Sequence, residues 1–430
     1  METKKDFRPW LVVIGCMLIQ AIPFGVASNI QPQFIGPIVE KYGFSLGAFS
    51  LTFTIGTFAS AIASPTIGKM FSKVAVKKIF LVGSILSGGG VLMLGMASSL
   101  PVFYVGYAVA QIGTAAISSI GVPVLITAWF DDKTKGKALG IAFAGGSIGN
   151  IFLQQIAVSQ IESVGPSQAY INFAIISLIV GIVTTLVLIN MPKNASTEDL
   201  GNVQSGHGHA EPTSTLPADF GYTFNEVKSM KSYWIYAVGF FFVGIYVSAL
   251  AMQYSAYLGS EGFDYSVLGV VGSTFAVFSL AGNLIGGAIF DKLGMFKAML
   301  IGGALAAISC VSLIFAPQIQ ALAYLYGASK GLSVFAYIIA PSFVTGSLFG
   351  KKEFGTILAV TNVLFALGFA AGSSVFGFLV DLAGYTLAWN VILVCIVLGY
   401  AMILTAIKTV TKLNDEKIAQ MNIDAQKIAN

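Results

Sequence analysis

The sequence predicts an all-α membrane protein with twelve transmembrane helices arranged as two six-helix halves. Three observations lead to this fold class. The chain of 430 residues is 56% hydrophobic and only 10% charged, with a mean hydropathy of +0.83. Apolar stretches of about 20 residues, the length that crosses a bilayer as a helix, recur along it. One polar segment divides these stretches into two sets, and the two sets share related sequences.

The apolar runs are predicted to be helices because transmembrane strands are shorter and alternate in polarity. In the first half the predicted spans are residues 10–38, 46–71, 77–99, 101–130, 138–161 and 168–191. In the second half they are residues 232–259, 265–290, 296–316, 319–349, 355–380 and 385–409. The first run is long and lacks a small-residue cleavage site, so we expect a retained helix and not a signal peptide.

The linker between the halves is predicted at residues 192–230, where the apolar pattern stops. This segment is polar, contains three prolines and is rich in Ser, Gly and Asn, which is typical of loops. The predicted domains are a first half at 1–191, this cytoplasmic linker, a second half at 231–410 and a charged cytoplasmic tail at 411–430.

Histidines and cysteines predict neither a metal site nor a disulfide. His207 and His209 stand two residues apart in the linker, which is a weak metal signal, and their role is left open. Cys16, Cys310 and Cys395 lie singly in separate predicted helices without ligand spacing. We therefore expect no metal and no cofactor.

Basic residues predict the orientation in the membrane. If the loops alternate sides, all of the 23 Lys and Arg residues except Lys41 and Lys330 fall on the side of the termini. Cytoplasmic loops carry such an excess, so both termini and the linker are expected in the cytoplasm, with the protein in the cell membrane. The net charge of +4 is thus explained by topology, and a nucleic-acid partner is not favoured.

Two loops repeat one motif. After the second predicted helix the chain reads Gly68-Lys-Met-Phe-Ser72-Lys73-Val-Ala75-Val-Lys77-Lys78, and after the eighth it reads Gly287-Ala-Ile-Phe-Asp291-Lys292-Leu-Gly294-Met-Phe-Lys297. Parallel repeats of this kind are typical of the two halves of secondary transporters.

Both loops resemble the G-x-x-x-D-R/K-x-G-x-R/K-R/K signature of the major facilitator superfamily. The second copy is nearly complete, whereas the first has Ser72 in the acidic position and Ala75 in the second glycine position. The resemblance implies a latch that forms in one conformation and breaks in the other, weaker on the side of Ser72 because serine carries no charge. The alternative is a tight turn with topological lysines. The predicted gating residues are Gly68, Lys73, Lys77, Lys78, Gly287, Asp291, Lys292, Gly294 and Lys297.

Within that superfamily the chain resembles the oxalate/formate exchanger and monocarboxylate transporter group. The similar stretches are Gly25 to Ser45, Trp129-Phe130, Gly136 to Gly149, and Phe349 to Tyr385. The resemblance implies a small organic anion, such as a monocarboxylate, carried by alternating access through anion exchange or H⁺ symport. The sequence departs from the group where basic residues are expected, since Asn283 and Thr361 occupy those positions of the eighth and eleventh spans.

Lys330 is the charge that the apolar pattern does not explain. It lies about eleven residues into the run 319–349, roughly 16 Å deep at 1.5 Å per residue, too deep for easy snorkelling. A charge inside a membrane is normally tolerated where it faces the bundle interior or a cavity. At helical spacing Lys330 shares one face with Tyr326, Ser333, Tyr337 and Pro341, where a carboxylate could take charge-assisted hydrogen bonds.

Other polar and aromatic residues of the spans complete the predicted site. Buried amides and hydroxyls can equally hold helices together. The predicted substrate-binding residues are Lys330, Tyr337, Tyr326, Ser333, Phe34, Gln33, Asn29, Tyr254, Asn283 and Thr361.

Several functional classes are disfavoured. No Asp or Glu lies inside a predicted span, and neither a nucleotide-binding loop nor a nucleophile–base pair is present. We therefore expect no enzyme, and H⁺ symport would require Lys330 or the substrate to take the proton. An exporter of hydrophobic compounds and a non-transporting membrane sensor stay open as alternatives. We expect a monomer whose partners are the anion and membrane lipid.

Overall fold

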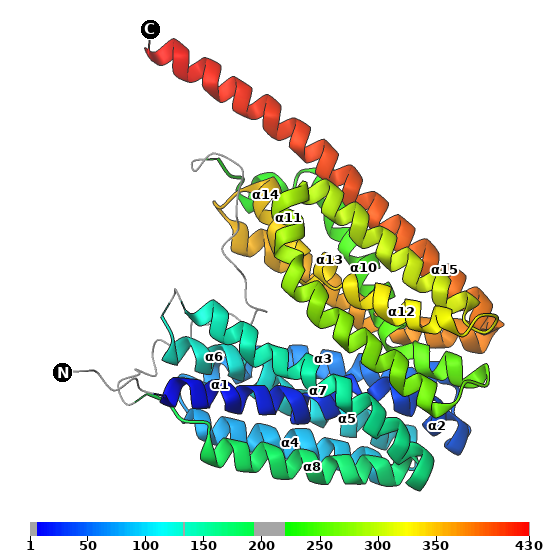
Figure 1. The fold of residues 1–430 in the computed structure, drawn as a ribbon. Coiled ribbons are helices and arrows are strands. Elements are labelled where there is room, and N and C mark those ends of the chain that lie inside the picture. The colour runs from blue at the N-terminus through cyan, green and yellow to red at the C-terminus, as the bar shows by residue number, and fades with distance from the viewer. Residues whose placement is uncertain (1–6, 132–133, 193–219, 430) are drawn as a thin grey trace.

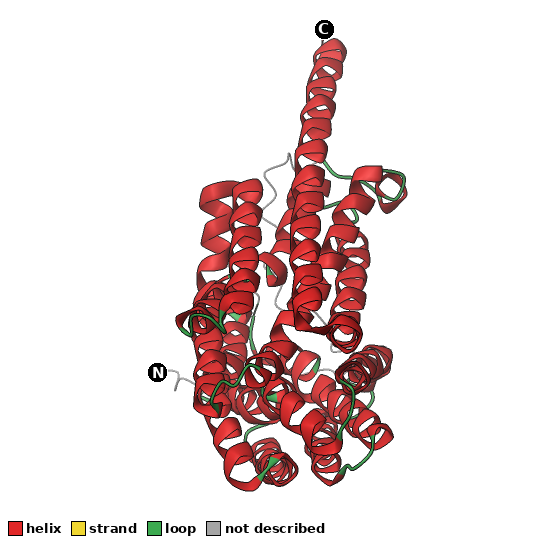
Figure 2. Cartoon of the chain, turned by 90° about the vertical axis from the view of Figure 1, so that its right-hand side faces the viewer, coloured by secondary structure: helices red, strands yellow, loops and turns green. Residues whose placement is uncertain are grey.

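The computed structural model of the protein describes residues 7–131, 134–192 and 220–429. Within these ranges nearly the whole chain is helical and no strand forms, apart from a single bridge between Gly221 and Gly350 (Figure 2). His207 and His209 lie outside the described residues. The predicted all-α fold class is confirmed.

The helices form two bodies, one from each half of the chain (Figure 1). The first body contains α1 (Arg8–Ile19), η1 (Gln20–Asn29), α2 (Gln31–Tyr42), α3 (Leu46–Met70), α4 (Val76–Met96), α5 (Leu100–Thr114), η2 (Ala115–Ser119), α6 (Gly121–Trp129), α7 (Lys135–Val164) and α8 (Pro166–Val187). The second contains α9 (Phe224–Val227), α10 (Lys231–Ser260), α11 (Tyr265–Phe315), α12 (Ala321–Leu332), α13 (Phe335–Ile338), α14 (Ala340–Phe349) and α15 (Phe354–Ala429).

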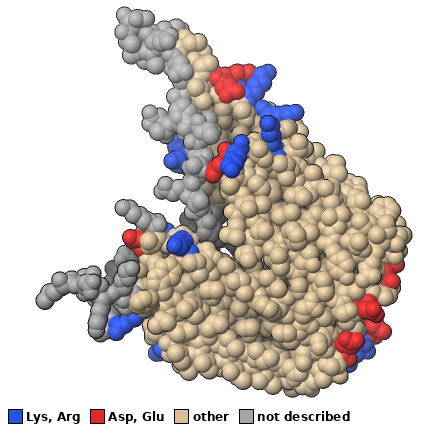
Figure 3. Space-filling model, viewed as in Figure 1, with Lys and Arg blue, Asp and Glu red and all other residues tan. Residues whose placement is uncertain are grey.

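Ten helical stretches of the described residues are long and apolar enough to cross a membrane. Two of them, α11 and α15, each contain one break, at Gly294 (φ 73°) and Gly384 (φ 79°). Left-handed backbone of this kind is readily adopted by glycine, and it reverses the chain, so each of these stretches crosses twice. The count therefore becomes the twelve predicted spans. On the face shown in Figure 3, charged side chains gather at the ends of the molecule and leave an uncharged belt between them. The chain is a multi-pass membrane protein.

The two repeated loops make their turns by different means. Gly294 turns in the left-handed region, where a side chain would be strained. Ala75, which occupies the matching position, takes φ −54° and ψ 127°, and any residue can adopt this conformation. The loss of glycine in the first copy is therefore tolerated because that turn has another shape.

Glycines bring α7 against the first helix. A Cβ atom at Gly145 would lie 2.4 Å from the carbonyl oxygen of Met17, and one at Gly149 would lie 2.5 Å from that of Ala21. Contacts this short exclude any side chain at these two positions. The residue that follows Gly149, Asn150, is thereby held close to η1.

The end of the predicted linker packs on the second body. The backbone N–H of Tyr222 donates to Phe349 O (2.9 Å), and its hydroxyl donates to Asn414 Oδ1 (2.9 Å). Thr223 and Glu226 form a capping box at the start of α9, and the hydrogen bonds from Thr223 to the Glu226 carboxylate lower the pKa of Glu226. Asn414 belongs to α15, which continues as a helix through the segment predicted as a charged tail.

Candidate functional site

The two bodies are tied together at the end of the bundle away from both termini (Figure 1). Asp381 of α15 accepts hydrogen bonds from the backbone N–H groups of Leu46 (3.0 Å) and Gly47 (2.8 Å), the first residues of α3. Gln253 of α10 donates to Ser50 Oγ of the first body (2.8 Å) and to Ser373 Oγ of its own (2.8 Å). These bonds close this end.

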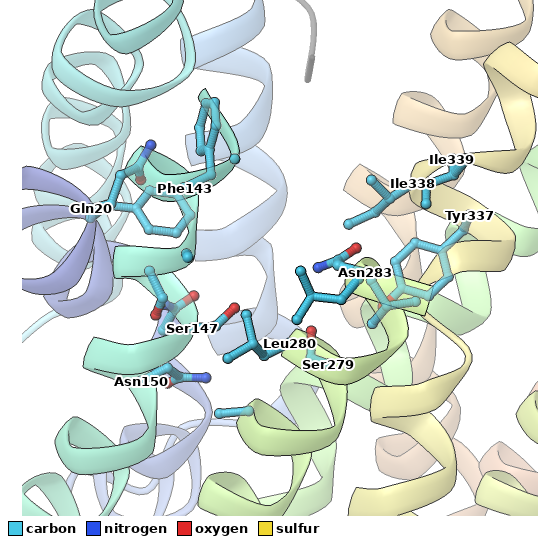
Figure 4. A pocket seen from close by; sticks show the side chains of 18 of the residues that line it. Gln20, Phe143, Ser147, Asn150, Ser279, Leu280, Asn283, Tyr337, Ile338 and Ile339 are labelled. Carbon is cyan, nitrogen blue, oxygen red and sulfur yellow. The ribbon is translucent and has the colours of Figure 1, made fainter. Parts of the chain in front are cut away.

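The bodies separate toward the other end, where both termini lie, and a gap is visible between them in Figure 3. A cavity of about 680 Å³ lies between them (Figure 4). Its first wall consists of Gln20, Phe24, Asn29, Ser118, Ser119, Gly140, Phe143, Ala144, Gly146, Ser147 and Asn150. Its second wall consists of Phe275, Ala276, Ser279, Leu280, Asn283, Leu284, Gly287, Val334, Tyr337, Ile338, Ile339, Ser342 and Phe343. Both bodies therefore contribute to one site.

The lining is polar but uncharged. The described residues that line the cavity include no Lys, Arg, Asp or Glu. Their polar groups are amides and hydroxyls, interspersed with phenylalanine and aliphatic side chains. Most ligand cavities combine an apolar lining with a few placed polar groups in this way.

Lys330 lies directly behind this lining. Its Nζ is 3.4 Å from the hydroxyl oxygen of Tyr337, which does line the cavity. The same Nζ lies 4.6 Å from the ring centre of Tyr337 and 5.5 Å from that of Tyr246. Lys330 has 0% of its surface exposed and is the one charged side chain among the described buried residues. The ammonium group therefore contacts two aromatic rings. No carboxylate of the described chain pairs with it.

The predicted stripe on an unbroken helix needs correction. The helix of Lys330, α12, ends at Leu332, and a short α13 and then α14 follow. Ser333 uses its hydroxyl to bond the Lys330 carbonyl oxygen (2.8 Å), and Tyr326 donates to Leu250 O. Only Tyr337 of the predicted stripe therefore meets both Lys330 and the cavity.

The structure divides the other six predicted substrate-binding residues into three sets. Asn29 and Asn283 line the cavity. Gln33 and Tyr254 instead hydrogen-bond to each other across the two bodies (2.8 Å).

Two predicted residues serve packing in this conformation. Phe34 stacks on Tyr170, with ring centres 3.8 Å apart. Thr361 donates to Ile357 O (3.2 Å) within its own helix.

Sequence reasoning did not select Gln20, Ser118 and Asn150. Gln20 begins the π-helix η1, and Ser118 lies in the second π-helix, η2. Such helices are rare and frequent at functional sites, but their hydrogen-bond pattern is not readable from composition. Asn150 had a usable signal, because it follows the glycine-rich stretch Gly145–Gly149 as an amide in an apolar run.

The predicted gating residues are not engaged in this conformation. Gly68 and Gly287 have no atom within 4 Å of the position where a Cβ would stand. Asp291 is exposed, and its carboxylate has no hydrogen bond or ion pair with any residue that the structure describes. Lys77 bonds Asn190 Oδ1 of its own body (3.3 Å). Lys73, Lys78, Lys292, Gly294 and Lys297 lie exposed at the same end.

A cavity between two related halves is typical of secondary transporters. The sequence matches the Major Facilitator Superfamily over residues 13–373 and again over residues 262–421. The chain belongs to this superfamily.

Similar proteins include the oxalate:formate antiporter of Oxalobacter formigenes, 25% identical over 379 residues, with 86% of this chain and 83% of that one covered. The synaptic vesicular amine transporter of Rattus norvegicus is 23% identical, over 78% of this chain and 62% of its own length. Among solved structures, a bacterial homolog of the human lysosomal transporter Spinster has a TM-score of 0.70 at 16% identity, covering 95% of this chain and 99% of that one.

Proposed function

We propose that this transporter carries a small organic anion, most simply a monocarboxylate, across the cell membrane by alternating access. The observation that carries the proposal is Lys330, a fully buried ammonium beside the cavity without a carboxylate partner in the described chain. Removing a charge from water is costly unless it is paired. A substrate carboxylate would supply the missing negative charge.

Tyr337 controls the access of a substrate to Lys330. The Tyr337 ring lines the cavity, and its hydroxyl is within 3.4 Å of Lys330 Nζ. An arriving carboxylate would first accept a hydrogen bond from this hydroxyl and would reach the ammonium after a small displacement of the ring. Charge-assisted hydrogen bonds donated by the ammonium and phenol groups favour an anion over a neutral analogue of the same shape.

The conformation described is the inward-facing one under this proposal. The excess of lysines at the open end favours a cytoplasmic location for it. The bonds of Asp381 and Gln253 would then close the extracellular end. Transport would follow from rocking of the halves about the cavity, driven by exchange of one anion for another or by H⁺ symport. The similarity to the oxalate:formate antiporter supports exchange.

A second candidate is export of hydrophobic compounds. The observation in its favour is the uncharged lining, which includes Phe24, Phe143, Phe275 and Phe343. An amine, the substrate class in the name of one relative, is less compatible with this cavity. The described lining of the cavity offers no carboxylate to pair with a protonated amine. The two candidates differ in their need for Lys330.

Uptake into proteoliposomes tests the proposal. We expect labelled monocarboxylates to enter, and Lys330→Met to reduce this uptake at least about tenfold, the loss of one charge-assisted hydrogen bond. Lys41→Met is the matched control, since Lys41 is exposed and bonds Ser167 Oγ away from the cavity. Carboxylate uptake by Lys330→Met at the wild-type rate would refute the anion proposal and favour hydrophobic export.

A further inference from the structure

Four buried polar side chains form a line of hydrogen bonds from the second body to the cavity. Ser255 Oγ donates to Gln33 Oε1 (2.6 Å), and Gln33 Nε2 donates to Gln154 Oε1 (2.7 Å). Gln154 Nε2 then donates to Asn150 Oδ1 (2.8 Å). All four residues are buried, so water does not compete for these bonds. The line ends at the cavity wall, because Asn150 is part of the lining.

Two backbone carbonyl groups determine the direction of this line. Gln33 Nε2 also donates to Leu268 O (3.3 Å), and Gln154 Nε2 also donates to Asn29 O (2.9 Å). A carbonyl oxygen can only accept a hydrogen bond, so neither glutamine amide can be turned around. Asn150 Oδ1 must therefore be the acceptor from Gln154, and the group that Asn150 has left to offer is the donor Nδ2.

The remaining Asn150 amide group faces the cavity. Figure 4 shows its nitrogen directed toward the space between the two walls. No described residue accepts a hydrogen bond from Asn150 Nδ2. The Asn150 amide nitrogen therefore opens on the cavity, where it can donate to an acceptor on a molecule that enters it.

Gln20 repeats the arrangement on the same wall. Ser118 Oγ donates to Gln20 Oε1 (2.9 Å), while Gln20 Nε2 is buried and has no hydrogen-bond partner among the described residues. Two amides of the first body thus have their oxygen atoms occupied and their nitrogen atoms available. The first wall presents donors, and the second wall presents Tyr337 with Lys330 behind it.

We propose that Asn150 binds a second oxygen acceptor of the substrate, on the wall opposite Tyr337. This inference rests on the proposed transport of an organic anion. It narrows the substrate to a monocarboxylate with a further acceptor, such as a carbonyl oxygen, at the end away from its carboxylate. The carboxylate is held by the second body and the far oxygen by the first, so one ligand contacts both halves.

Binding of matched acids to the purified full-length protein tests this inference. The probes are pentanoate with 4-oxopentanoate, and hexanoate with 5-oxohexanoate, since each pair differs only in the far carbonyl oxygen. We expect the oxo acid to bind up to about tenfold more tightly than its partner, because it gains one hydrogen bond. The measurement is the dissociation constant from calorimetry.

The variants separate a binding role of Asn150 from a structural one. Asn150→Ala should reduce the preference for the oxo acid over the plain acid to about twofold or less. Asn150→Asp keeps the side-chain shape and the oxygen that accepts from Gln154, but it replaces the donor nitrogen with a second oxygen. Binding of the oxo acid should therefore weaken in this variant as well. Asn172→Ala is the control, because Asn172 Nδ2 bonds Gln160 Oε1 away from the cavity. The melting temperature without ligand checks folding.

The outcomes distinguish failure of this inference from failure of the proposed function. An unchanged preference in both Asn150 variants, or an equal loss for both acids, would overturn the role of Asn150 while the anion function stands. If the wild type binds neither acid of either pair but does bind tetraphenylphosphonium, a hydrophobic cation, then the anion function fails and this inference fails with it.

Discussion

Asp381 is expected to hold the two bodies in the conformation described here. Its two carboxylate oxygens accept from the N–H groups of Leu46 and Gly47 at the start of α3. Helix N-terminal N–H groups lack partners within their own helix and attract negative charge. Because Leu46 and Asp381 belong to different bodies, these bonds must break when the halves separate at this end.

The magnitude follows from the geometry. A hydrogen bond to a charged group contributes about 1.5–3 kcal/mol when buried. Because the Asp381 side chain is exposed to solvent, its two hydrogen bonds together are expected to contribute only about 1–2 kcal/mol. Asp381→Ala should therefore change the ratio of the two conformations by roughly 5- to 30-fold. A second conformation that is about 1% populated in the wild type would rise to between about 5% and 25%.

Distances between spin labels measure this shift. We would label Lys137→Cys and Thr356→Cys, which are exposed residues of opposite bodies, after replacing the buried Cys16, Cys310 and Cys395. The wild type should show mainly the long distance of the open end. Asp381→Ala should add a shorter one.

The matched control is Asp264→Ala. Asp264 is an exposed carboxylate that has no side-chain bond at the start of its helix, α11. Distance distributions that do not differ between Asp381→Ala and the wild type, or an equal shift in Asp264→Ala, would refute the reasoning.

Two further predictions concern gating and orientation. Asp291 is exposed and unpartnered within the described chain. Asp291→Asn should therefore slow turnover in proteoliposome uptake and leave the substrate dissociation constant, measured by binding, near that of the wild type. A loss of affinity at an unchanged maximal rate would contradict a gating role. Ser205→Cys, in the part of the linker outside the described residues, should not react with an impermeant thiol reagent on intact cells, and labelling there would reverse the orientation.

The helical architecture was predictable from the sequence because the bilayer imposes it. A span must be apolar over about 20 residues, and its backbone must bond internally, so the runs of apolar residues and their polar boundaries are sufficient to place helices. Gly294 and Gly384 were also placed correctly between spans, since a reversal of the chain between two helices favours a residue that tolerates a positive φ. The burial of Lys330, which has 0% of its surface exposed, agrees with its position well inside an apolar run.

The tertiary structure decided what each polar residue contacts. Gln33 and Asn150 are both amides in apolar runs, and composition cannot separate them. Gln33 meets Ser255, which is 222 residues away, and so becomes a bond between the bodies. Asn150 accepts a hydrogen bond from Gln154, whose amide orientation is fixed by the carbonyl oxygen of Asn29. The amide nitrogen of Asn150 is therefore left to donate toward the cavity. The helix break after Leu332 likewise leaves Tyr337 between Lys330 and the cavity. Hydrogen bonds depend on the partner that the fold supplies, whereas burial in a membrane depends on the chain itself.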